Sequence, residues 1–320
     1  MGEEFGLLPN GELVRRANIR NDTISLSVLT YGATMQSIEL KDVPFSLCLG
    51  FETLEQYLSS TACVGAIVGR VANRIGGGRA VIDGIPQIFD RNESNLHTLH
   101  GGSGNLASKN WSLVSHTSDA VRLQTQLKDG ENGFPGTMEI TADYILRAGN
   151  TLEIVLEAKT DASTLCNLAP HPYFNLNGSG DAREQSLFVN ADVLTEANAD
   201  KIPTGALLPV DDTPWDHRTE RQISESGAAY DHNYCVGKER TTLRPVARLK
   251  GMVSGATMQI ATTEPGLQVY DGGGLHPPYA GIALEPQCWP DAPNHETFPS
   301  ILLRPGETSR QVTQLTFSKS

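Results

Sequence analysis

Hydrophobic and polar residues alternate along several stretches of the chain, which is the period-two pattern of strands that bury one face. The pattern runs through residues 24–28, 121–127, 138–146, 152–158 and 315–317. Residues 147–150 read Arg-Ala-Gly-Asn, a sequence that favours a tight turn between the third and fourth stretches. Residues 137–159 are therefore predicted to form a β-hairpin.

Helical patterns are scarce in this sequence. Residues 53–58, Thr-Leu-Glu-Gln-Tyr-Leu, predict one or two helical turns, and little else keeps a 3.6-residue period. Strands do not alternate with helices, and no repeat of solenoid or propeller length occurs. Many strands separated by Gly, Pro, Asn and Asp predict an all-β fold, a large antiparallel sandwich with few short helices. We expect residues 1–320 to form a single domain of this kind.

The formal net charge of −12 argues against nucleic acid or an anionic membrane surface as a partner. The N-terminus shows no secretory signal, and no apolar stretch approaches the ~20 residues that cross a bilayer. Five cysteines are scattered without a Cys-x-x-Cys spacing, which is typical of reduced thiols in a reducing compartment. We therefore expect a cytoplasmic protein.

The common phosphate-loop, dinucleotide, hydrolase-elbow and zinc-protease motifs are missing from the sequence. Gly76–Gly78 is a glycine run without the lysine and hydroxyl residue of a phosphate loop, and we interpret it as a hairpin turn. His97 and His100 could be a surface pair or two metal ligands, although no third ligand stands at a suitable spacing. The sequence therefore favours chemistry without a metal or cofactor.

Five polar clusters lie in otherwise apolar or turn-forming segments. Their members are Asn73 and Arg74; His97 and His100; His171; Asp231 with His232, Asn233 and Tyr234; and Glu285. Glu285 is the most informative, because three apolar residues precede it and predict a buried strand. Burial raises the pKa of an unpaired carboxyl, which suits a general base or acid.

Each of these residues also has a structural interpretation. Arg74 and Asp231 could form a structural ion pair, and Glu285 could bridge a buried arginine. His171 lies between prolines and could cap a turn. Judged from the residues alone, the clusters indicate only a polar pocket in a β-sandwich.

Several of these residues belong to a longer series of short segments. The series comprises residues 69–75, 99–102, 171–176, 202–205, 230–234, 266–270, 283–287 and 303–307. In this order and at these intervals, the segments resemble the galactose mutarotase (aldose 1-epimerase) family over nearly the whole chain. The resemblance implies a β-supersandwich with an open cleft for a small-molecule aldose. It also implies an enzyme that interconverts the α and β anomers of free aldoses without metal or cofactor.

The resemblance further implies residue roles, position by position. Glu285 corresponds to the general base and His171 to the general acid. The contacts to the sugar hydroxyls and ring oxygen would come from His100, Arg74, Asn73, Asp231 and Gln268. Tyr173 and Asn175 follow His171 in the motif and would support it.

These residue types suit the opening of a pyranose ring. One proton must leave the C1 hydroxyl and another must reach the ring oxygen, which two positioned groups can do. A desolvated Glu285 can serve as the base, and His171 can serve as the acid if nearby carboxylates hold up its pKa. Rotation about C1–C2 then presents the other carbonyl face, and the two groups exchange roles on reclosure.

The sequence departs from the common family pattern in two places. Ala169 and Pro170 stand before His171 where many relatives have Thr-Asn, and the segment 271–279 is shorter than usual. This shorter segment could bring His276 and Tyr279 beside the sugar. The departures bear on the preferred aldose, which stays open between galactose, glucose and a pentose. The oligomeric state also stays open between a monomer and a homodimer.

Three other functions are compatible with parts of the pattern. A hexose-6-phosphate 1-epimerase of the same fold would need more basic residues in the cleft than Arg74. A non-catalytic sugar-binding module would be expected to lose the acid or the base, and both positions are filled. A glycosidase could use Glu285 and Asp231 as its carboxylate pair, at a characteristic separation.

Overall fold

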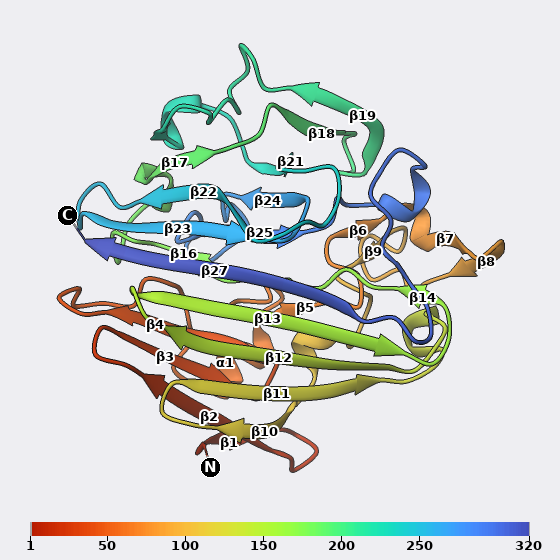
Figure 1. The fold of residues 1–320 in the computed structure, drawn as a ribbon, viewed down its shortest axis with the longest axis horizontal. Helices are drawn as coiled ribbons and strands as arrows, with labels where there is room; N and C mark the ends of the chain where they lie inside the picture. Colours follow the sequence, from red (N-terminus) through yellow and green to blue (C-terminus); the bar gives the residue numbers. More distant parts are fainter. Residues whose placement is uncertain (1, 320) are drawn as a thin grey trace.

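The computed structural model describes residues 2–319, and most of its strands gather in three antiparallel sheets (Figure 1). The largest sheet has nine strands, in the spatial order β10 (Ser112–His116), β11 (Ala120–Leu127), β12 (Met138–Arg147), β13 (Thr151–Thr160), β27 (Ser309–Lys319), β23 (Ala256–Thr262), β22 (Arg244–Lys250), β17 (Ser186–Val189) and β20 (Arg221–Gln222). The last strand, β27, is hydrogen-bonded between β13 and β23. Segments far apart in the sequence therefore share one sheet.

Two further sheets complete the sandwich. The six-stranded sheet has the order β16 (Tyr173–Phe174), β25 (Ile282–Gln287), β24 (Gly266–Tyr270), β21 (Asp231–Cys235), β18 (Val193–Ala197) and β19 (Pro203–Pro209). The four-stranded sheet is a meander of β1 (Glu3–Leu7), β2 (Leu13–Arg20), β3 (Ile24–Leu29) and β4 (Thr34–Leu40). The predicted all-β antiparallel sandwich is confirmed.

Short pairs and turns join these sheets. The two-stranded pairs are β14 (Thr164–Leu165) with β26 (Leu302–Leu303), β15 (Ala169–Pro170) with β5 (Ile67–Val68), β6 (Arg74–Ile75) with β9 (Thr98–Leu99), and β7 (Arg79–Ile82) with β8 (Ile85–Ile88). Among the described residues the one α-helix is α1 (Leu54–Ser59). The 3₁₀ turns are η1 (Gly76–Gly78), η2 (Leu106–Ser108), η3 (Glu131–Gly133), η4 (Ala182–Glu184), η5 (Ser224–Ser226) and η6 (Ala292–Asn294).

The alternating stretches form the strands that they predict. The predicted hairpin is β12 and β13, whose register runs from Met138 opposite Thr160 to Arg147 opposite Thr151. Its turn includes Gly149 and Asn150 at φ 74° and 57°, the left-handed region that glycine and asparagine adopt most readily. The helical turns predicted for residues 53–58 form α1, and the Gln56 side chain accepts a hydrogen bond from the Thr53 N–H at 3.0 Å.

The interpretation of Gly76–Gly78 as a hairpin turn is wrong. The run forms η1 between β6 and β7, and these two strands pair with β9 and β8 instead of with each other. Gly76 donates its N–H to Asp291 Oδ1 at 2.9 Å, and Gly77 donates to His97 Nδ1 at 3.1 Å. The glycines therefore bring the backbone against side chains from distant segments.

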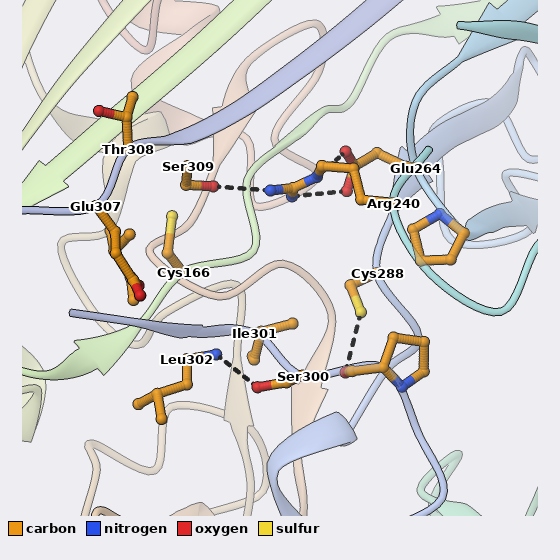
Figure 2. Close-up of a pocket in the computed structure, with 13 residues that line it drawn as sticks. Cys166, Arg240, Glu264, Cys288, Ser300, Ile301, Leu302, Glu307, Thr308 and Ser309 are labelled. Atoms are coloured by element: carbon orange, nitrogen blue, oxygen red, sulfur yellow. Dashed lines mark hydrogen bonds and ion pairs between the residues drawn. The ribbon is translucent and has the colours of Figure 1, made fainter. Parts of the chain in front are cut away.

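A hollow of about 330 Å³ lies beside the segment that leads into β27 (Figure 2). Two of its charged residues, Arg240 and Glu264, are bonded to each other. Arg240 donates from Nε to Glu264 Oε1 at 2.6 Å and from Nη2 to Oε2 at 2.9 Å, and its Nη1 donates to Ser309 Oγ at 3.1 Å. The fully buried Glu264 is thus paired through both oxygens, and we interpret this hollow as structural.

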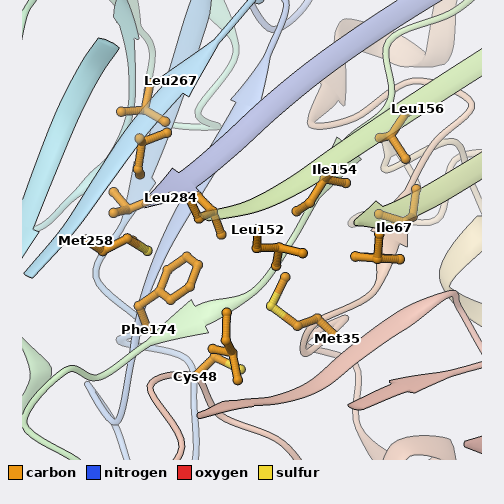
Figure 3. Close-up of a cluster of buried hydrophobic side chains, with 14 of the residues drawn as sticks. Met35, Cys48, Ile67, Leu152, Ile154, Leu156, Phe174, Met258, Leu267 and Leu284 are labelled. Carbon is orange, nitrogen blue, oxygen red and sulfur yellow. The ribbon is translucent and has the colours of Figure 1, made fainter. Parts of the chain in front are cut away.

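The main core lies where the three sheets meet (Figure 3). It combines Met35 of β4, Leu152 and Leu156 of β13, Met258 of β23, Phe174 of β16, Leu267 of β24 and Leu284 of β25. Burying each such side chain stabilises the fold by about 1.5–3 kcal/mol. Because strand neighbours point to opposite faces, Leu267 and Leu284 in the core place Gln268 and Glu285 on the other face of the six-stranded sheet.

Candidate active site

A cleft of about 240 Å³ opens on this other face of the six-stranded sheet. The strands β16, β25, β24 and β21 contribute to it, and loops from the first third of the chain close its sides. Its lining comprises Thr61, Ala62, Cys63, Asn73, Arg74, Leu99, His100, His171, Tyr173, Lys201, Asp231, Tyr270, Gly274 and Glu285. The lining therefore includes all the predicted site residues except Gln268, whose buried side chain is hydrogen-bonded to Asp231.

Glu285 stands in the middle of β25 with only 2% of its surface exposed. Its Oε2 has no hydrogen-bond partner among the described residues. Burial raises the pKa of Glu285 well above its usual value; the nearby Asp231 raises it further, and Arg74 opposes the shift. The carboxyl therefore holds its proton at a pH where an exposed glutamate would be ionised.

His171 follows β15 and faces Glu285 across the cleft. Its Nε2 lies 3.5 Å from Glu285 Oε1, and its Nδ1 has no partner within residues 2–319. Burial lowers the pKa of His171 to about 4, although Asp231 acts in the opposite direction. The expectation that nearby carboxylates hold up this pKa is wrong, because desolvation of the buried imidazole outweighs their charge.

Asp231 opens β21 and accepts donors on both of its carboxylate oxygens. Gln268 donates from Nε2 to Oδ1 at 2.7 Å, and Lys201 Nζ lies 2.6 Å from Oδ2. Arg74 Nη1 lies 3.8 Å from the same Oδ2. Gln268 is only 2% exposed and is the register partner of Glu285 in the pair β24 and β25. Its hydrogen bond therefore ties Asp231 to the strand next to Glu285.

Arg74 is held mainly by Glu93. Its Nε and Nη2 donate to the two Glu93 oxygens, both at 2.8 Å, in a bidentate pair. The sequence leaves open an ion pair between Arg74 and Asp231. At 3.8 Å this contact is longer than the contact between Arg74 and Glu93. Nη1 takes no part in the bidentate pair, and Arg74 lines the cleft beside Asp231.

Asn73 and His100 hold each other in place. The Asn73 N–H donates to His100 Nδ1 at 3.2 Å, and the His100 N–H donates to the Asn73 carbonyl at 3.0 Å. Since Nδ1 accepts, the ring proton of neutral His100 is on Nε2. Burial, with help from His171 and Arg74, lowers the pKa of His100 well below its usual value, so the ring presents one donor. Gly101 must be glycine here, because a Cβ would lie 2.4 Å from the Gly69 carbonyl oxygen.

His97 lies outside the cleft, unlike His100. Its Nδ1 accepts from Gly77 as described above, and its side chain is buried. No group of three or more His, Cys, Asp or Glu among residues 2–319 has an arrangement that could hold a metal ion. Likewise, no helix of the described chain is long and apolar enough to span a membrane.

The shorter segment 271–279 does not bring His276 or Tyr279 into the lining of the cleft. His276 is exposed, and neither residue lines the cleft. The Tyr279 ring instead stacks on the Arg183 guanidinium, whose Cζ lies 3.4 Å from the ring centre. From the segment 271–279 only Gly274 reaches the cleft, and its N–H donates to the Tyr270 hydroxyl at 2.6 Å.

Sequence reasoning missed Lys201, Tyr270 and the wall formed by residues 61–63. Lys201 stands before the Ile-Pro-Thr-Gly segment in a polar turn, where a lysine gives no signal beyond surface polarity. Tyr270 ends a matching segment and could have been found from its position. Residues 61–63 follow α1 and belong to none of the matching segments.

Comparison with known proteins agrees with this geometry. The family model for aldose 1-epimerase matches residues 15–316. A galactose mutarotase from Rattus norvegicus is 34% identical, with 98% of this chain and 97% of the relative covered. An aldose 1-epimerase from Escherichia coli is 30% identical, with 99% of each covered.

Solved structures show the same fold. An aldose epimerase homologue from C. elegans superposes with a TM-score of 0.91 at 30% identity, covering 96% of this chain and 99% of that one. A galactose 1-epimerase from Lactobacillus acidophilus gives a TM-score of 0.89 at 25% identity, covering 100% and 98%. The chain belongs to the aldose 1-epimerase family. Its activity is the interconversion of the α and β anomers of an aldose, a small sugar substrate.

Proposed function

We propose that Glu285 and His171 form the acid–base pair that opens and recloses the ring of a neutral, free aldose, with galactose among the sugars accepted. The observation that carries this proposal is their contact at 3.5 Å inside the cleft, with one unpartnered buried atom on each residue. A bound sugar can supply the missing partners through its C1 hydroxyl and ring oxygen.

The pair holds one proton in total between the lowered pKa of His171 and the raised pKa of Glu285. Burial favours the neutral form of both groups, with the proton on Glu285. Transfer of this proton to His171 gives the carboxylate base and the imidazolium acid. Arg74 favours the carboxylate form of Glu285, and Asp231 favours the protonated form of His171.

The reaction then follows from the positions of the two groups. Glu285 takes the proton of the C1 hydroxyl while His171 gives its proton to the ring oxygen, and the bond from C1 to the ring oxygen breaks. The open aldehyde rotates about C1–C2. On reclosure the former ring oxygen attacks the other face of C1, its proton returns to His171, and Glu285 gives its proton back to the oxygen on C1. Protons balance over the cycle, and no other reactant is consumed.

The other cleft residues are proposed to bind the sugar. His100 offers its Nε2–H and Arg74 its Nη1 donors, while Asn73 and Asp231 lie beside them. Gln268 donates to Asp231 and orients its carboxylate, and the expected contact of Gln268 with the sugar stays a prediction. The cations of the cleft are each paired with a carboxylate, Arg74 with Glu93 and Lys201 with Asp231, which favours a neutral sugar over a phosphorylated one.

Substitution at the two positions tests the acid–base assignment. Glu285→Gln and His171→Asn should each lower kcat for galactose mutarotation, followed by polarimetry, by at least ~10²-fold while the protein stays folded. The matched controls are Glu264→Gln and His217→Asn, which change a buried glutamate and a buried histidine outside the cleft. Near-wild-type rates in a cleft variant would remove that residue from its role.

Three expectations from the sequence stay predictions. They are the single domain over residues 1–320, the cytoplasmic location, and a monomer or homodimer without nucleic-acid partners. The position of β27 between β13 and β23 supports the first. Sedimentation of the purified protein would decide the oligomeric state.

A further inference from the structure

Lys201 lies at the tip of the turn that joins β18 to β19, and backbone contacts fix its position. The Asn198 N–H donates to the Ile202 carbonyl at 2.9 Å, and the Lys201 N–H donates to the Asn198 carbonyl at 2.9 Å. The Asn198 side chain also accepts from the Ile202 N–H at 3.0 Å. Lys201 has a φ of 62°, so the turn is tight and directs this side chain over the cleft.

The Lys201 ammonium covers one side of Asp231. Its Nζ lies 2.6 Å from Asp231 Oδ2, while Gln268 occupies Oδ1. The Lys201 side chain is 50% exposed and that of Asp231 is 19% exposed. A ligand that enters the cleft therefore meets the ammonium together with the carboxylate, and cannot reach Oδ2 without meeting Lys201.

We propose that Lys201 is a further substrate-binding residue, which donates a hydrogen bond to one sugar hydroxyl while Asp231 holds its ammonium in place. This inference rests on the proposed function, in which the cleft binds a free aldose. An ammonium group carries three N–H donors, and the single carboxylate oxygen beside it does not use them all. Lys201 lines the same cleft as Glu285 and His171.

The charge of Lys201 fits a hydroxyl better than an anion. Asp231 already balances the ammonium, and Glu93 balances Arg74, so the cleft offers no uncompensated positive charge. A hydroxyl can accept from Lys201 and donate to Asp231 at once, which makes the pair selective for one oriented hydroxyl. Lys201 would thereby select among sugars that differ at that single position.

The test combines a substitution in the protein with a deletion in the sugar. Lys201→Met gives an unbranched side chain that is one atom shorter, places another non-glycine residue at the same positive φ, and removes the donors. Calorimetric Kd and mutarotation KM are measured for galactose and for its 2-, 3-, 4- and 6-deoxy analogues. Lys201→Arg serves as the conservative variant. Lys109→Met removes a comparable ion pair with Glu131, outside the cleft, and is the matched control.

For galactose, Lys201→Met should raise Kd and KM about tenfold and leave kcat within about twofold, a typical loss for one exposed charged hydrogen bond. For one deoxy sugar, wild type and Lys201→Met should bind equally, because the hydroxyl that Lys201 contacts is missing. Lys201→Arg should recover part of the affinity, and Lys109→Met should match wild type.

Two outcomes would overturn the proposal. Equal weakening for every sugar would show that Lys201 only supports the shape of the cleft, and unchanged Kd for galactose would show no contact. The binding measurement does not depend on turnover. An acid–base pair assigned to the wrong residues would therefore leave the sugar-dependent loss of affinity intact, so the two proposals fail separately.

Discussion

Nε2 of His171 lies 3.5 Å from Oε1 of Glu285, and burial moves the pKa values of these two groups in opposite directions. The imidazole stays neutral down to acidic pH, whereas the carboxyl stays protonated above its usual range. A single proton therefore belongs to the pair between the lowered pKa of His171 and the raised pKa of Glu285, and the two macroscopic pKa values are properties of the pair. Ring opening removes one proton from the C1 hydroxyl and gives another to the ring oxygen. It therefore needs one group of the pair without its proton and the other with it.

The pH profile of kcat/KM should be broad, with its acid limb near pH 4. Below the pKa of about 4 for His171, both groups carry protons and no base remains. Above the raised pKa of Glu285, both have lost their protons and no acid remains. The profile is measured by polarimetry after subtraction of spontaneous mutarotation, and kcat/KM reports the free enzyme. An acid limb near pH 6.5 would show that His171 titrates like an exposed imidazole.

Glu285→Gln should raise the thermal stability of the protein at neutral pH. The folded-state pKa of Glu285 is raised, so its contribution to stability is present below the unfolded value near 4.5 and is lost as pH rises through the folded value. The glutamine carries no charge to bury and escapes this loss. We expect a Tm increase of about 2 °C or more at pH 8, and a much smaller one at pH 5.

The measurement is a calorimetric or fluorescence melting curve of both proteins at each pH. Glu264→Gln is a control with the opposite expected result. Glu264 is paired with Arg240, so removal of its charge should lower Tm. An equal or lower Tm for Glu285→Gln at pH 8 would mean that the carboxyl is better solvated than its burial indicates.

Long strands and buried charges could be predicted from the sequence because each leaves a local pattern. The alternation in 138–146 and 152–158 specifies β12 and β13, and the apolar residues before Glu285 specify a buried carboxyl. Two-residue strands such as β6 and β15 are too short to show a period. Their places depend on contacts with distant segments.

Side-chain directions at turns could not be predicted. His97 and His100 are three residues apart, yet only His100, at φ 52°, faces the cleft, because the backbone reverses at that point. The direction of the Lys201 side chain likewise depends on a turn, which the backbone hydrogen bond between Asn198 and Ile202 closes. The pKa direction of His171 was also missed, since it depends on how completely the sandwich buries the ring and not on which charges lie nearby in the sequence.

Activity should be independent of metal ions. Ring opening needs only the two proton transfers, and no described cluster of side chains has the arrangement of a metal site. Dialysis against a chelator should leave kcat/KM unchanged, with wild-type protein dialysed against buffer as the control. Loss of activity that one divalent ion restores would contradict the proposed mechanism and reopen the metal interpretation of His97 and His100.

The range of sugars should be wide. In the segment 271–279 only the glycine Gly274 reaches the cleft, while His276 is exposed and Tyr279 packs on Arg183. This wall therefore offers no side chain that would lose a partner when a sugar lacks its hydroxymethyl group. Such a difference costs about 1–3 kcal/mol, so galactose, glucose and arabinose should fall within about two orders of magnitude in kcat/KM.

Initial mutarotation rates of these three sugars and of galactose 6-phosphate, measured in one buffer, test this range. The phosphorylated sugar should be the slowest, because Arg74 and Lys201 are each paired with a carboxylate and a phosphate would have to displace Glu93 or Asp231. Activity confined to one free sugar would mean that Gly274 and Tyr270 enclose the ligand tightly. A preference for the phosphorylated sugar would mean that Lys201 leaves Asp231 to bind the phosphate, and would contradict the neutral-sugar proposal.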